Sequence, residues 1–230
     1  MLRKIVTELT ARTAKFVVRQ SGNRHDVDYF VQQAAVKDSA EYAVQHMSKG
    51  MRFPDRYGLF KRSFQLAPAN GIALEFGVYT GRSMRFLGAL FPQRKFFGFD
   101  SFVGLKEAWI GTSALAGRFN VGGKLPKVPP NVTLLKGWFD ESLPPFLAEH
   151  DEPLAFVHID SDTYESTKTV LDLLESRLVP GVVIQFDEYF GYPGWRENEF
   201  RAFQEFIKRT GLRYEYIGYG YVSVAVILRS

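Results

Sequence analysis

Two apolar runs in the C-terminal half of the chain each end on acidic residues. The runs are Leu154–His158 and Val182–Phe186, and the acids that follow them are Asp160, Asp162, Asp187 and Glu188. Short apolar runs bounded in this way are typical of buried parallel strands. Ligands of doubly wound sheets bind just beyond the carboxyl ends of the strands. If the two strands are neighbours, the carboxylates converge at one edge and repel one another. A divalent cation bound by the carboxylate oxygens is the simplest way to compensate this repulsion.

The alternation of apolar runs with amphipathic stretches extends from residue 72 to the end of the chain. Besides these two strands, we expect strands at residues 72–77, 95–99, 131–137, 213–218 and 221–228, the last two joined by Tyr219 and Gly220. Helices are expected at residues 81–91, 144–150, 164–178 and 197–210. Strands that alternate with helices and then end in a hairpin predict a doubly wound α/β fold with a mostly parallel, seven-stranded sheet.

The length and composition favour one α/β domain with a helical N-terminal extension. A chain of 230 residues that is 46% hydrophobic can bury one substantial core. We expect the extension to span residues 1–70, with helices at about 2–17, 27–48 and 54–65, and the main domain to span residues 71–230. The extension would cover the acceptor side of a site or form a dimer contact, so we expect a homodimer. For the basic first helix, packing on the body or on a second subunit, membrane-surface attachment and a targeting role remain open.

Charge and hydropathy exclude several classes of partner. No apolar run approaches the roughly 20 residues that a membrane span needs, and the N-terminus lacks the apolar region of a secretory signal. We therefore expect a cytoplasmic protein without a membrane span. The absence of cysteine excludes thiol chemistry and disulfides. The net charge of +4 is concentrated in the first twenty residues, and the near-neutral remainder argues against a nucleic-acid partner.

A glycine-containing turn follows the first strand of the main domain. The segment LEFGVYTGRS places Glu75, Gly77 and Gly81 where a strand passes into a helix, and glycines there let the backbone approach a ligand. Tyr79 stands where a G-x-G-x-x-G motif has its middle glycine, which argues against a pyrophosphate packed on the turn. Asp100 ends the next strand, where a carboxylate can accept hydrogen bonds from both hydroxyls of a ribose. This pattern indicates a nucleotide-binding turn and is compatible with a cofactor that lacks phosphates.

Several of these side chains also have a purely structural interpretation. Trp138–Asp140 follows the third strand and could border an adenine, but its two aromatic side chains could equally belong to the core. Glu75 could be a satisfied acid at a strand end, and Gly81 a plain turn glycine. His158 lies inside an apolar strand, where we expect a satisfied core histidine rather than a ligand.

The sequence gives fewer signals for the part of a site that would bind the acceptor molecule. Residues 103–130 contain many glycines and prolines, and a loop of this length in a compact domain is usually functional or mobile. Aromatic side chains could line an acceptor pocket together with this loop: Trp109, Tyr189, Phe190, Tyr192 and Trp195. Core packing explains any one of them equally well.

Five segments together resemble the metal-dependent small-molecule O-methyltransferases that include macrocin, mycinamicin and novobiocin methyltransferases. The segments are LEFGVYTGRS, FFGFDSFVGL, KGWFDESLP, HIDSDTYESTKTVLDLL and VPGVVIQFDEYFGYPG, within residues 72–200. The resemblance implies a class I, Rossmann-like methyltransferase that uses S-adenosylmethionine, or holds S-adenosylhomocysteine, together with Mg²⁺. It also implies an acceptor hydroxyl on a small molecule, such as the sugar of a glycoside or a polyphenol-like natural product.

The resemblance further implies roles for particular residues. Those that would hold the methionine part of S-adenosylmethionine are Glu75, Gly77, Val78, Tyr79, Gly81 and Ser83. Those that would contact the ribose and the adenine are Asp100, Ser101, Trp138, Phe139 and Asp140. The implied metal ligands are Asp160, Asp187 and Glu188, and the implied catalytic residues are Asp160 and Asp162, with Asp162 as general base. Glu188 departs from the family pattern, which has an aspartate there, and the extra methylene moves the carboxylate outward.

The chemistry of such a site is consistent with these residue types. Methyl transfer from a sulfonium needs the acceptor oxygen in line behind the methyl carbon, so placement supplies most of the gain in rate. A metal ion and a nearby carboxylate help an acceptor hydroxyl to lose its proton. Asp162 has a second interpretation as the N-cap of the following helix, with Glu165 completing a capping box. A nicotinamide-dependent dehydrogenase and a non-catalytic binding protein of the same fold are the alternative functions.

Overall fold

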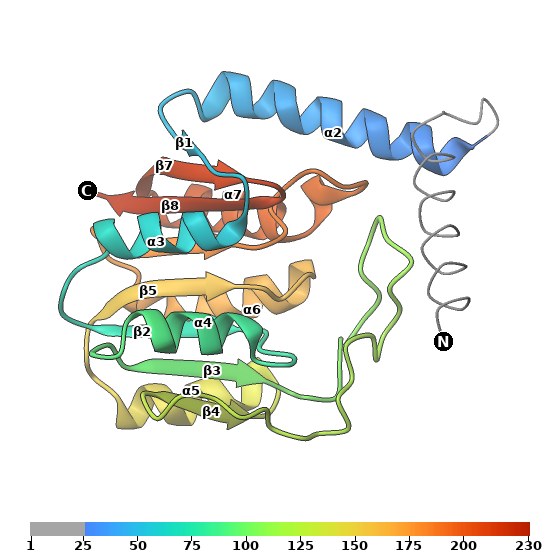
Figure 1. Ribbon diagram of the computed structural model, residues 1–230. Coiled ribbons are helices and arrows are strands. Elements are labelled where there is room, and N and C mark those ends of the chain that lie inside the picture. The colour runs from blue at the N-terminus through green and yellow to red at the C-terminus, as the bar shows by residue number, and fades with distance from the viewer. Residues whose placement is uncertain (1–25) are drawn as a thin grey trace, which may run out of the picture.

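The computed structural model describes residues 26–230 and contains one eight-stranded sheet with helices on both faces (Figure 1). Its strands are β1 (Met51–Arg52), β2 (Ile72–Phe76), β3 (Phe96–Asp100), β4 (Val132–Lys136), β5 (Leu154–Ile159), β6 (Val183–Phe186), β7 (Arg213–Gly220) and β8 (Ser223–Arg229). The order across the sheet is β1-β7-β8-β6-β5-β2-β3-β4, and β8 alone runs against its neighbours. The doubly wound, mostly parallel α/β fold is confirmed. The strand beyond the seven expected is β1, a two-residue exposed edge strand too short to leave an apolar pattern.

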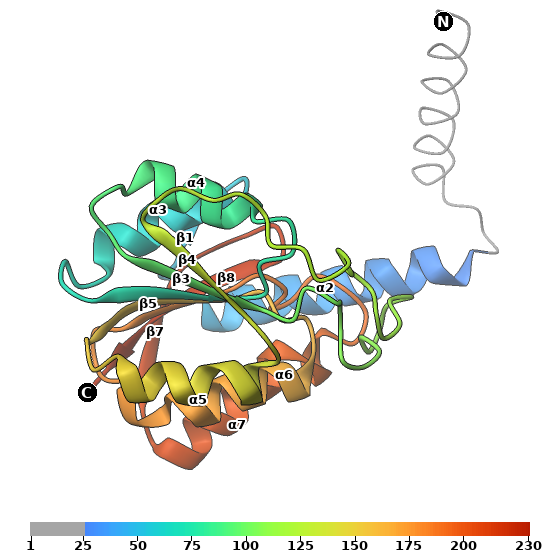
Figure 2. The same cartoon turned by 90° about the horizontal axis from the view of Figure 1, so that it is seen from below.

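The helices form a layer on each face of this sheet (Figure 2). They are α2 (Val27–His46), α3 (Arg56–Leu66), α4 (Arg82–Leu90), α5 (Phe139–Glu149), α6 (Tyr164–Leu174) and α7 (Glu199–Thr210), with short 3₁₀ turns at η1 (Glu175–Arg177) and η2 (Trp195–Glu197). Figure 2 shows α3 and α4 on one face and α5, α6 and α7 on the other. Each layer buries its apolar side against the sheet, which gives one hydrophobic cluster per face.

The central strands place the acidic residues at one edge of the sheet. All residues of β5 and β6 are buried, which explains why both read as continuous apolar runs. The two strands are parallel neighbours, with Ile159 opposite Phe186. The backbone N–H of Asp187 donates to the carbonyl of Ile159 at 2.9 Å, so the residues that follow the two strands lie side by side. The expectation that these two strand ends meet is confirmed.

Element boundaries differ from expectation at three places. The fifth helix begins at Phe139 rather than Pro144, because Asp140 and Glu141 provide a favourable acidic first turn and the two prolines lie inside the helix. α6 ends at Leu174 and continues as a 3₁₀ turn to Arg177. The terminal hairpin turns after Gly220 rather than at residues 219–220, with Tyr221 in a left-handed conformation (φ 58°).

Part of the N-terminal extension is integrated with the sheet. β1 pairs with β7, and α3 packs against β6, β7 and β8 with Leu59 and Phe60 fully buried. α2 is mostly exposed and contacts the body through a few residues such as Tyr42 and Ala43. The helix expected at residues 2–17 lies outside the described residues. Among the helices of residues 26–230, none combines the length and the apolar character needed to cross a membrane.

Candidate functional site

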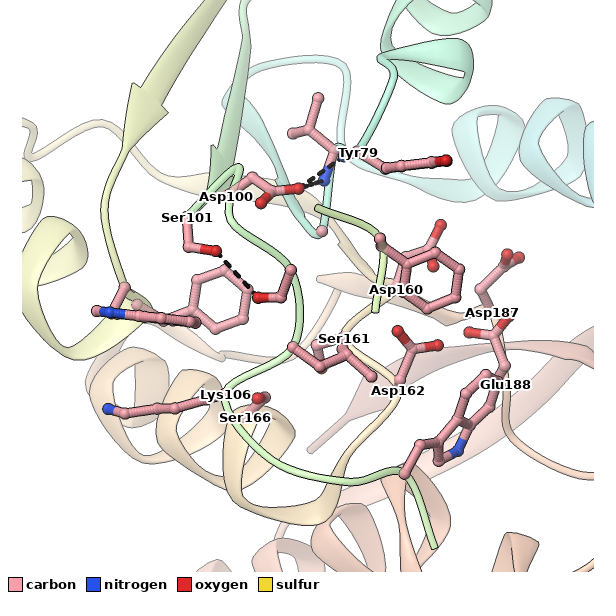
Figure 3. Close-up of a pocket in the computed structure, with 18 of the residues that line it drawn as sticks. Tyr79, Asp100, Ser101, Lys106, Asp160, Ser161, Asp162, Ser166, Asp187 and Glu188 are labelled. Atoms are coloured by element: carbon pink, nitrogen blue, oxygen red, sulfur yellow. Dashed lines mark hydrogen bonds between the residues drawn. The ribbon is translucent and has the colours of Figure 1, made fainter. Parts of the chain in front are cut away.

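A cavity of about 750 Å³ opens at the carboxyl edge of the strands (Figure 3). Most of the residues predicted for the site line it: Gly77, Val78, Tyr79, Ser83, Asp100, Ser101, Trp138, Phe139, Asp140, Asp160, Asp162, Asp187 and Glu188. Figure 3 shows Asp100 and Ser101 on one side of the cavity and the acids that follow β5 and β6 on the other. The volume is in the range of small-molecule and cofactor pockets. Glu75 and Gly81 are the predicted residues that do not line it.

The turn between β2 and α4 depends on Gly77. Its φ of +95° is one that side chains disfavour, and a Cβ there would lie 1.8 Å from the carbonyl oxygen of Asp160. The glycine therefore lets the end of β2 pack directly against the residue that follows β5. Tyr79 also has a positive φ (50°), and Gly81 starts α4 from a left-handed conformation.

Asp100 binds the backbone of two loops. One carboxylate oxygen accepts from the N–H groups of Val78 (2.9 Å) and Tyr79 (2.6 Å), and the other accepts from Phe102 N–H (2.6 Å). Since each carboxylate oxygen has about two acceptor positions, one position remains for a ligand hydroxyl. The neighbouring Ser101 hydroxyl donates to the carbonyl of Gly104 at 3.1 Å.

Glu75 and His158 form a buried pair behind the cavity. Glu75 accepts from the Ser83 hydroxyl (2.8 Å) through one oxygen and pairs with His158 Nδ1 (2.8 Å) through the other. Burial lowers the pKa of His158, but the carboxylates of Asp187 and Glu75 raise it more, to about 10. His158 Nε2 lies 3.9 Å from Asp187, too far for a hydrogen bond. The expected burial of His158 in the core is confirmed, but the histidine is only half satisfied, because within residues 26–230 its Nε2 has no hydrogen-bond partner. Glu75 is a satisfied acid at a buried strand position.

Two overlapping groups of possible metal ligands lie at the strand ends. Asp160, Asp162 and Glu188 offer oxygens within 4.8 Å of one another, and His158, Asp160 and Asp187 form the second group. Burial, with added repulsion from Asp187, raises the pKa of Asp160 and of Glu188 well above the ordinary values. Burial, followed by repulsion from Glu199, raises the pKa of Asp162. One oxygen of Glu188 is buried and has no hydrogen-bond partner among residues 26–230. Asp160 belongs to both groups, whereas Asp187 and Glu188, the other two predicted ligands, belong to different ones, and Asp162 lies with Asp160 and Glu188.

Asp187 is more fully paired than the other acids. Its carboxylate accepts from the Ser223 hydroxyl (2.8 Å) and pairs with Arg56. Burial raises the pKa of Asp187, but His158, Arg56 and Ser223 lower it more, so its net value is below the ordinary one. Asp187 is thus the acid of the cluster that is most readily ionised.

Sequence reasoning missed Arg56, which lies at the first position of α3 and lines the cavity. Its guanidinium forms ion pairs with Asp187 and, at 3.4 Å, with Asp160. Burial lowers the pKa of Arg56, but the two carboxylates raise it more. No local signal distinguishes this arginine from a surface residue at the start of a helix, because its partners are 104 and 131 residues away.

Glu199 is a second residue that sequence reasoning missed. It is fully buried at the start of α7 and accepts backbone N–H groups from Ser161 (3.2 Å), Asp162 (3.3 Å) and Glu188 (3.2 Å). Burial and repulsion from Asp160 raise its pKa to about 8. One carboxylate thus connects the loops after β5 and β6, so α7 sets the spacing of the acids. In a sequence, an acid in the first turn of a helix is normally explained by its favourable interaction with the helix dipole. For this reason the sequence does not reveal the role of Glu199 in the site.

The N-cap interpretation of Asp162 is wrong. The N-cap of α6 is Thr163, whose hydroxyl oxygen accepts from the N–H of Ser166 at 3.4 Å. Asp162 instead adopts a left-handed conformation (φ 64°) and lines the cavity. Tertiary contacts maintain this unfavourable backbone, and residues in such conformations are concentrated at functional sites.

The segment Trp138–Asp140 combines core and cavity contacts. The Phe139 ring packs edge-on against Phe76 at 5.4 Å between centroids, while Phe139 also lines the cavity. Asp140 pairs with Lys106 at 3.2 Å, and the Lys106 ammonium lies 5.5 Å from the Trp138 ring centroid. The loop after β3 therefore covers this end of the cavity.

Loop 103–130 contributes six residues to the lining of the cavity: Gly104, Leu105, Lys106, Glu107, Trp109 and Phe119. Of the aromatic side chains suggested for an acceptor pocket, Trp109 lines the cavity. The others are buried in the hydrophobic core: Tyr189, Phe190, Tyr192 and Trp195. Of the two interpretations left open, core packing therefore holds for those four residues of the segment after β6, and an acceptor pocket remains for Trp109.

Comparisons with known proteins identify relatives of this chain. Residues 74–189 match a family model described as a methyltransferase domain. A curated protein of Streptomyces olivaceus, 8-demethyl-8-(2,3-dimethoxy-alpha-L-rhamnosyl)-tetracenomycin-C 4'-O-methyltransferase, is 27% identical over 169 residues, or 64% of this chain. The match spans 64% of the length of that relative.

Two solved structures share the fold. CalS11, a calicheamicin methyltransferase, is 23% identical with a TM-score of 0.63, and the match covers 96% of this chain and 91% of that one. The O-methyltransferase NovP is 20% identical with a TM-score of 0.60, covering 76% of this chain and 79% of that one. These two structures confirm the class I methyltransferase fold that the resemblance implied. Because the family model spans half of the chain, from β2 to the residues after β6, the chain belongs to the methyltransferase-domain family.

Proposed function

We propose that this protein transfers a methyl group from S-adenosylmethionine to a hydroxyl of a small glycoside-like molecule, with help from Mg²⁺. The observation that carries the proposal is the joining of a glycine turn and an acid cluster in one cavity. Gly77 packs against the backbone of Asp160, so a cofactor on the turn would lie beside the acids. Membership of the methyltransferase-domain family supports the reaction type.

The cofactor would lie along the side of the cavity formed by β2, β3 and α5. The backbone of Gly77, Val78 and Tyr79 would border the methionine part. Asp100 would accept a ribose hydroxyl at the one acceptor position of its carboxylate that the backbone leaves open, with Ser101 beside it. Trp138–Asp140 would border the adenine, where the Lys106–Asp140 pair narrows the cavity. Glu75 would act indirectly, because it orients the Ser83 hydroxyl through a hydrogen bond of 2.8 Å.

The acid cluster suits a hard divalent ion. Carboxylate oxygens are the ligands that Mg²⁺ prefers, and Glu188 has a buried oxygen without a hydrogen-bond partner. The ion would be held by Asp160, Asp187 and Glu188. When bound, Mg²⁺ supplies positive charge that makes an acceptor hydroxyl easier to deprotonate.

Asp162 would accept the proton of the acceptor hydroxyl. It lines the cavity beside the proposed ligands, and its backbone is held by Glu199. The raised pKa of Asp162 makes its carboxylate a stronger proton acceptor than an exposed aspartate. Because the sulfonium carbon needs an in-line attack, the fixed backbone would contribute mainly through orientation.

Loop 103–130 would contact the acceptor through Trp109 and Phe119, two aromatic side chains that suit the flat apolar faces of a sugar or polyketide. The names of two relatives refer to rhamnose: the tetracenomycin enzyme, and CalS11, described as a TDP-rhamnose 3'-O-methyltransferase. We therefore propose a deoxysugar hydroxyl, free or attached to a polyketide, as the acceptor.

The decisive experiment incubates the full chain with S-adenosylmethionine and a panel of rhamnosyl acceptors, with Mg²⁺ or with EDTA. Mass spectrometry would detect methylated product, which we expect only with Mg²⁺. Asp162→Asn should reduce turnover by about a hundredfold or more, whereas Glu165→Gln, which removes another cavity carboxylate, should leave it nearly unchanged. Stabilisation by NADH and not by S-adenosylhomocysteine would favour a dehydrogenase instead. Cofactor binding without turnover on any acceptor would favour a non-catalytic binding protein.

Residues 71–230 would form the catalytic domain, and the extension would contribute a dimer contact. A homodimer is supported by apolar side chains exposed along α2: Val27, Phe30, Val31, Val36 and Val44. Light scattering on the full chain would test this, and a monomer at micromolar concentration would contradict it.

A further inference from the structure

Arg56 occupies a position that a cation between β5 and β6 would also use. Its Nη1 contacts one carboxylate oxygen of Asp160, at 3.4 Å, and one of Asp187. Within residues 26–230, these two carboxylates are the hydrogen-bond partners of the Arg56 guanidinium. The side chain is about one quarter exposed (27%), so the pair is partly shielded from water.

The charge balance around Arg56 is uneven. Five carboxylates gather at the strand ends: Asp160, Asp162, Asp187, Glu188 and Glu199. His158 also lies beside the cluster, and its Nδ1 is engaged by Glu75 at 2.8 Å. Arg56 contacts two of these carboxylates with a single positive charge, so a divalent ion in its place would compensate the cluster more fully than Arg56 does.

A magnesium ion and the Arg56 guanidinium would compete for the same two carboxylates, because two cations held on the same oxygens repel each other at close range. Mg²⁺ lies about 2.1 Å from its carboxylate oxygens and demands a near-octahedral shell. A guanidinium nitrogen lies about 2.8 Å from the oxygens it contacts. An ion held by Asp160 and Asp187 would place its double charge within a few ångströms of the guanidinium, and that repulsion favours departure of Arg56 from the carboxylates.

The Arg56 side chain can leave without unfolding its helix. The start of α3 is held by Asp55, whose carboxylate accepts the N–H of Gly58 at 2.9 Å. The guanidinium carbon already lies 5.8 Å from the Tyr57 ring centroid while it is paired with the acids, and this cation–π contact is independent of the two carboxylates. Rotation of the side chain torsions is therefore enough to free the carboxylates.

We propose that Arg56 is the resident counter-ion of the acid cluster and that a divalent ion binds there only by displacing it. This inference rests on the proposed Mg²⁺ site. Coupling between two binding events is reciprocal. The Arg56 ion pair therefore lowers the affinity for Mg²⁺ by the same factor by which bound Mg²⁺ lowers the stability of the ion pair. Arg56 would thus keep the strand ends together before the ion arrives and set the concentration at which it binds.

Isothermal titration of Mg²⁺ into wild type, R56A and R82A tests the competition directly. We expect R56A to bind Mg²⁺ about tenfold more tightly than wild type, a difference of about 1.4 kcal/mol. Arg82 is the matched control, because it lines the same cavity and lies 5.5 Å from the Tyr57 ring but forms no ion pair with the cluster in the described residues. R82A should therefore bind Mg²⁺ much like wild type.

Thermal unfolding provides a second readout that does not depend on activity. In EDTA, R56A should melt below wild type because the acids lose their counter-ion, and saturating Mg²⁺ should narrow that gap. R56Q, which keeps the length of the side chain, replaces R56A if the latter does not fold. Equal or weaker Mg²⁺ affinity in both Arg56 variants would overturn the competition while leaving the metal site in place. Absence of Mg²⁺ binding by wild type and by both variants would overturn the competition and the proposed site together.

Discussion

Gly77→Ala tests the link between the glycine turn and the acid cluster. The added Cβ would lie 1.8 Å from the carbonyl oxygen of Asp160, in a backbone with φ +95°. An ordinary contact requires the two groups to separate by about 1.5 Å, and well-packed interiors resist such shifts. The substitution would therefore displace the end of β5 together with the carboxylate of Asp160.

The expected cost has two parts. A left-handed conformation costs roughly 1–2 kcal/mol for a residue with a Cβ, and overpacking typically adds about 1–3 kcal/mol. We therefore expect Gly77→Ala to lower the free energy of unfolding by about 2–5 kcal/mol, a large share of the roughly 5–15 kcal/mol typical of a domain. The displaced carboxylate should also weaken Mg²⁺ binding.

Gly211→Ala is the matched control for this substitution. Gly211 ends α7 with φ +71°, and a Cβ there would meet nothing within 4 Å. The control therefore carries the backbone strain without the clash, at a cost of about 1–2 kcal/mol. Urea denaturation followed by circular dichroism measures both free energies. If the two variants are destabilised equally and bind Mg²⁺ alike, the close approach of Gly77 to Asp160 does not constrain the site.

Three further outcomes are expected. Asp162→Asn should reduce turnover by about a hundredfold or more while S-adenosylhomocysteine still binds in a calorimeter; near-normal turnover would remove Asp162 as the base. His158 has a folded-state pKa raised to about 10, so its protonation stabilises the fold fully below pH 6.5 and this contribution is lost as pH rises to 10. Chemical denaturation across that range should show the decline in wild type, and a His158→Gln variant with the same slope would contradict it. The raised pKa values of Asp160 and Glu188 mean that protons compete with a metal ion for these carboxylates. Mg²⁺ should therefore raise the melting temperature more at pH 8 than at pH 5.5. An equal rise at both pH values would count against carboxylate ligands.

Much of the fold could be predicted from local sequence patterns. Buried parallel strands need continuous apolar runs, and acidic residues follow the runs of β5 and β6. Both strands and the positions of their ends could therefore be predicted from the sequence. Gly77 and Asp100 were also identifiable, because a strand-to-helix turn requires a residue that tolerates positive φ and a strand-end acid can bind backbone or ligand hydroxyls. The start of α5 was less predictable, because its acidic first turn outweighs two prolines that favour a later start.

The sequence by itself determined the α/β alternation, the glycine turn and the acids that end two apolar strands, because each depends on residues close together in the chain. The sheet topology decided that these two strands are neighbours, so that their acids meet. Only the tertiary structure decided how those acids are paired and held. Arg56 reaches Asp187 across 131 residues, and Glu199 reaches the backbone of Asp162 across 37. Such partners are selected by packing of α3 and α7 on the sheet, and a side chain carries no local sign of the distant group that it will meet.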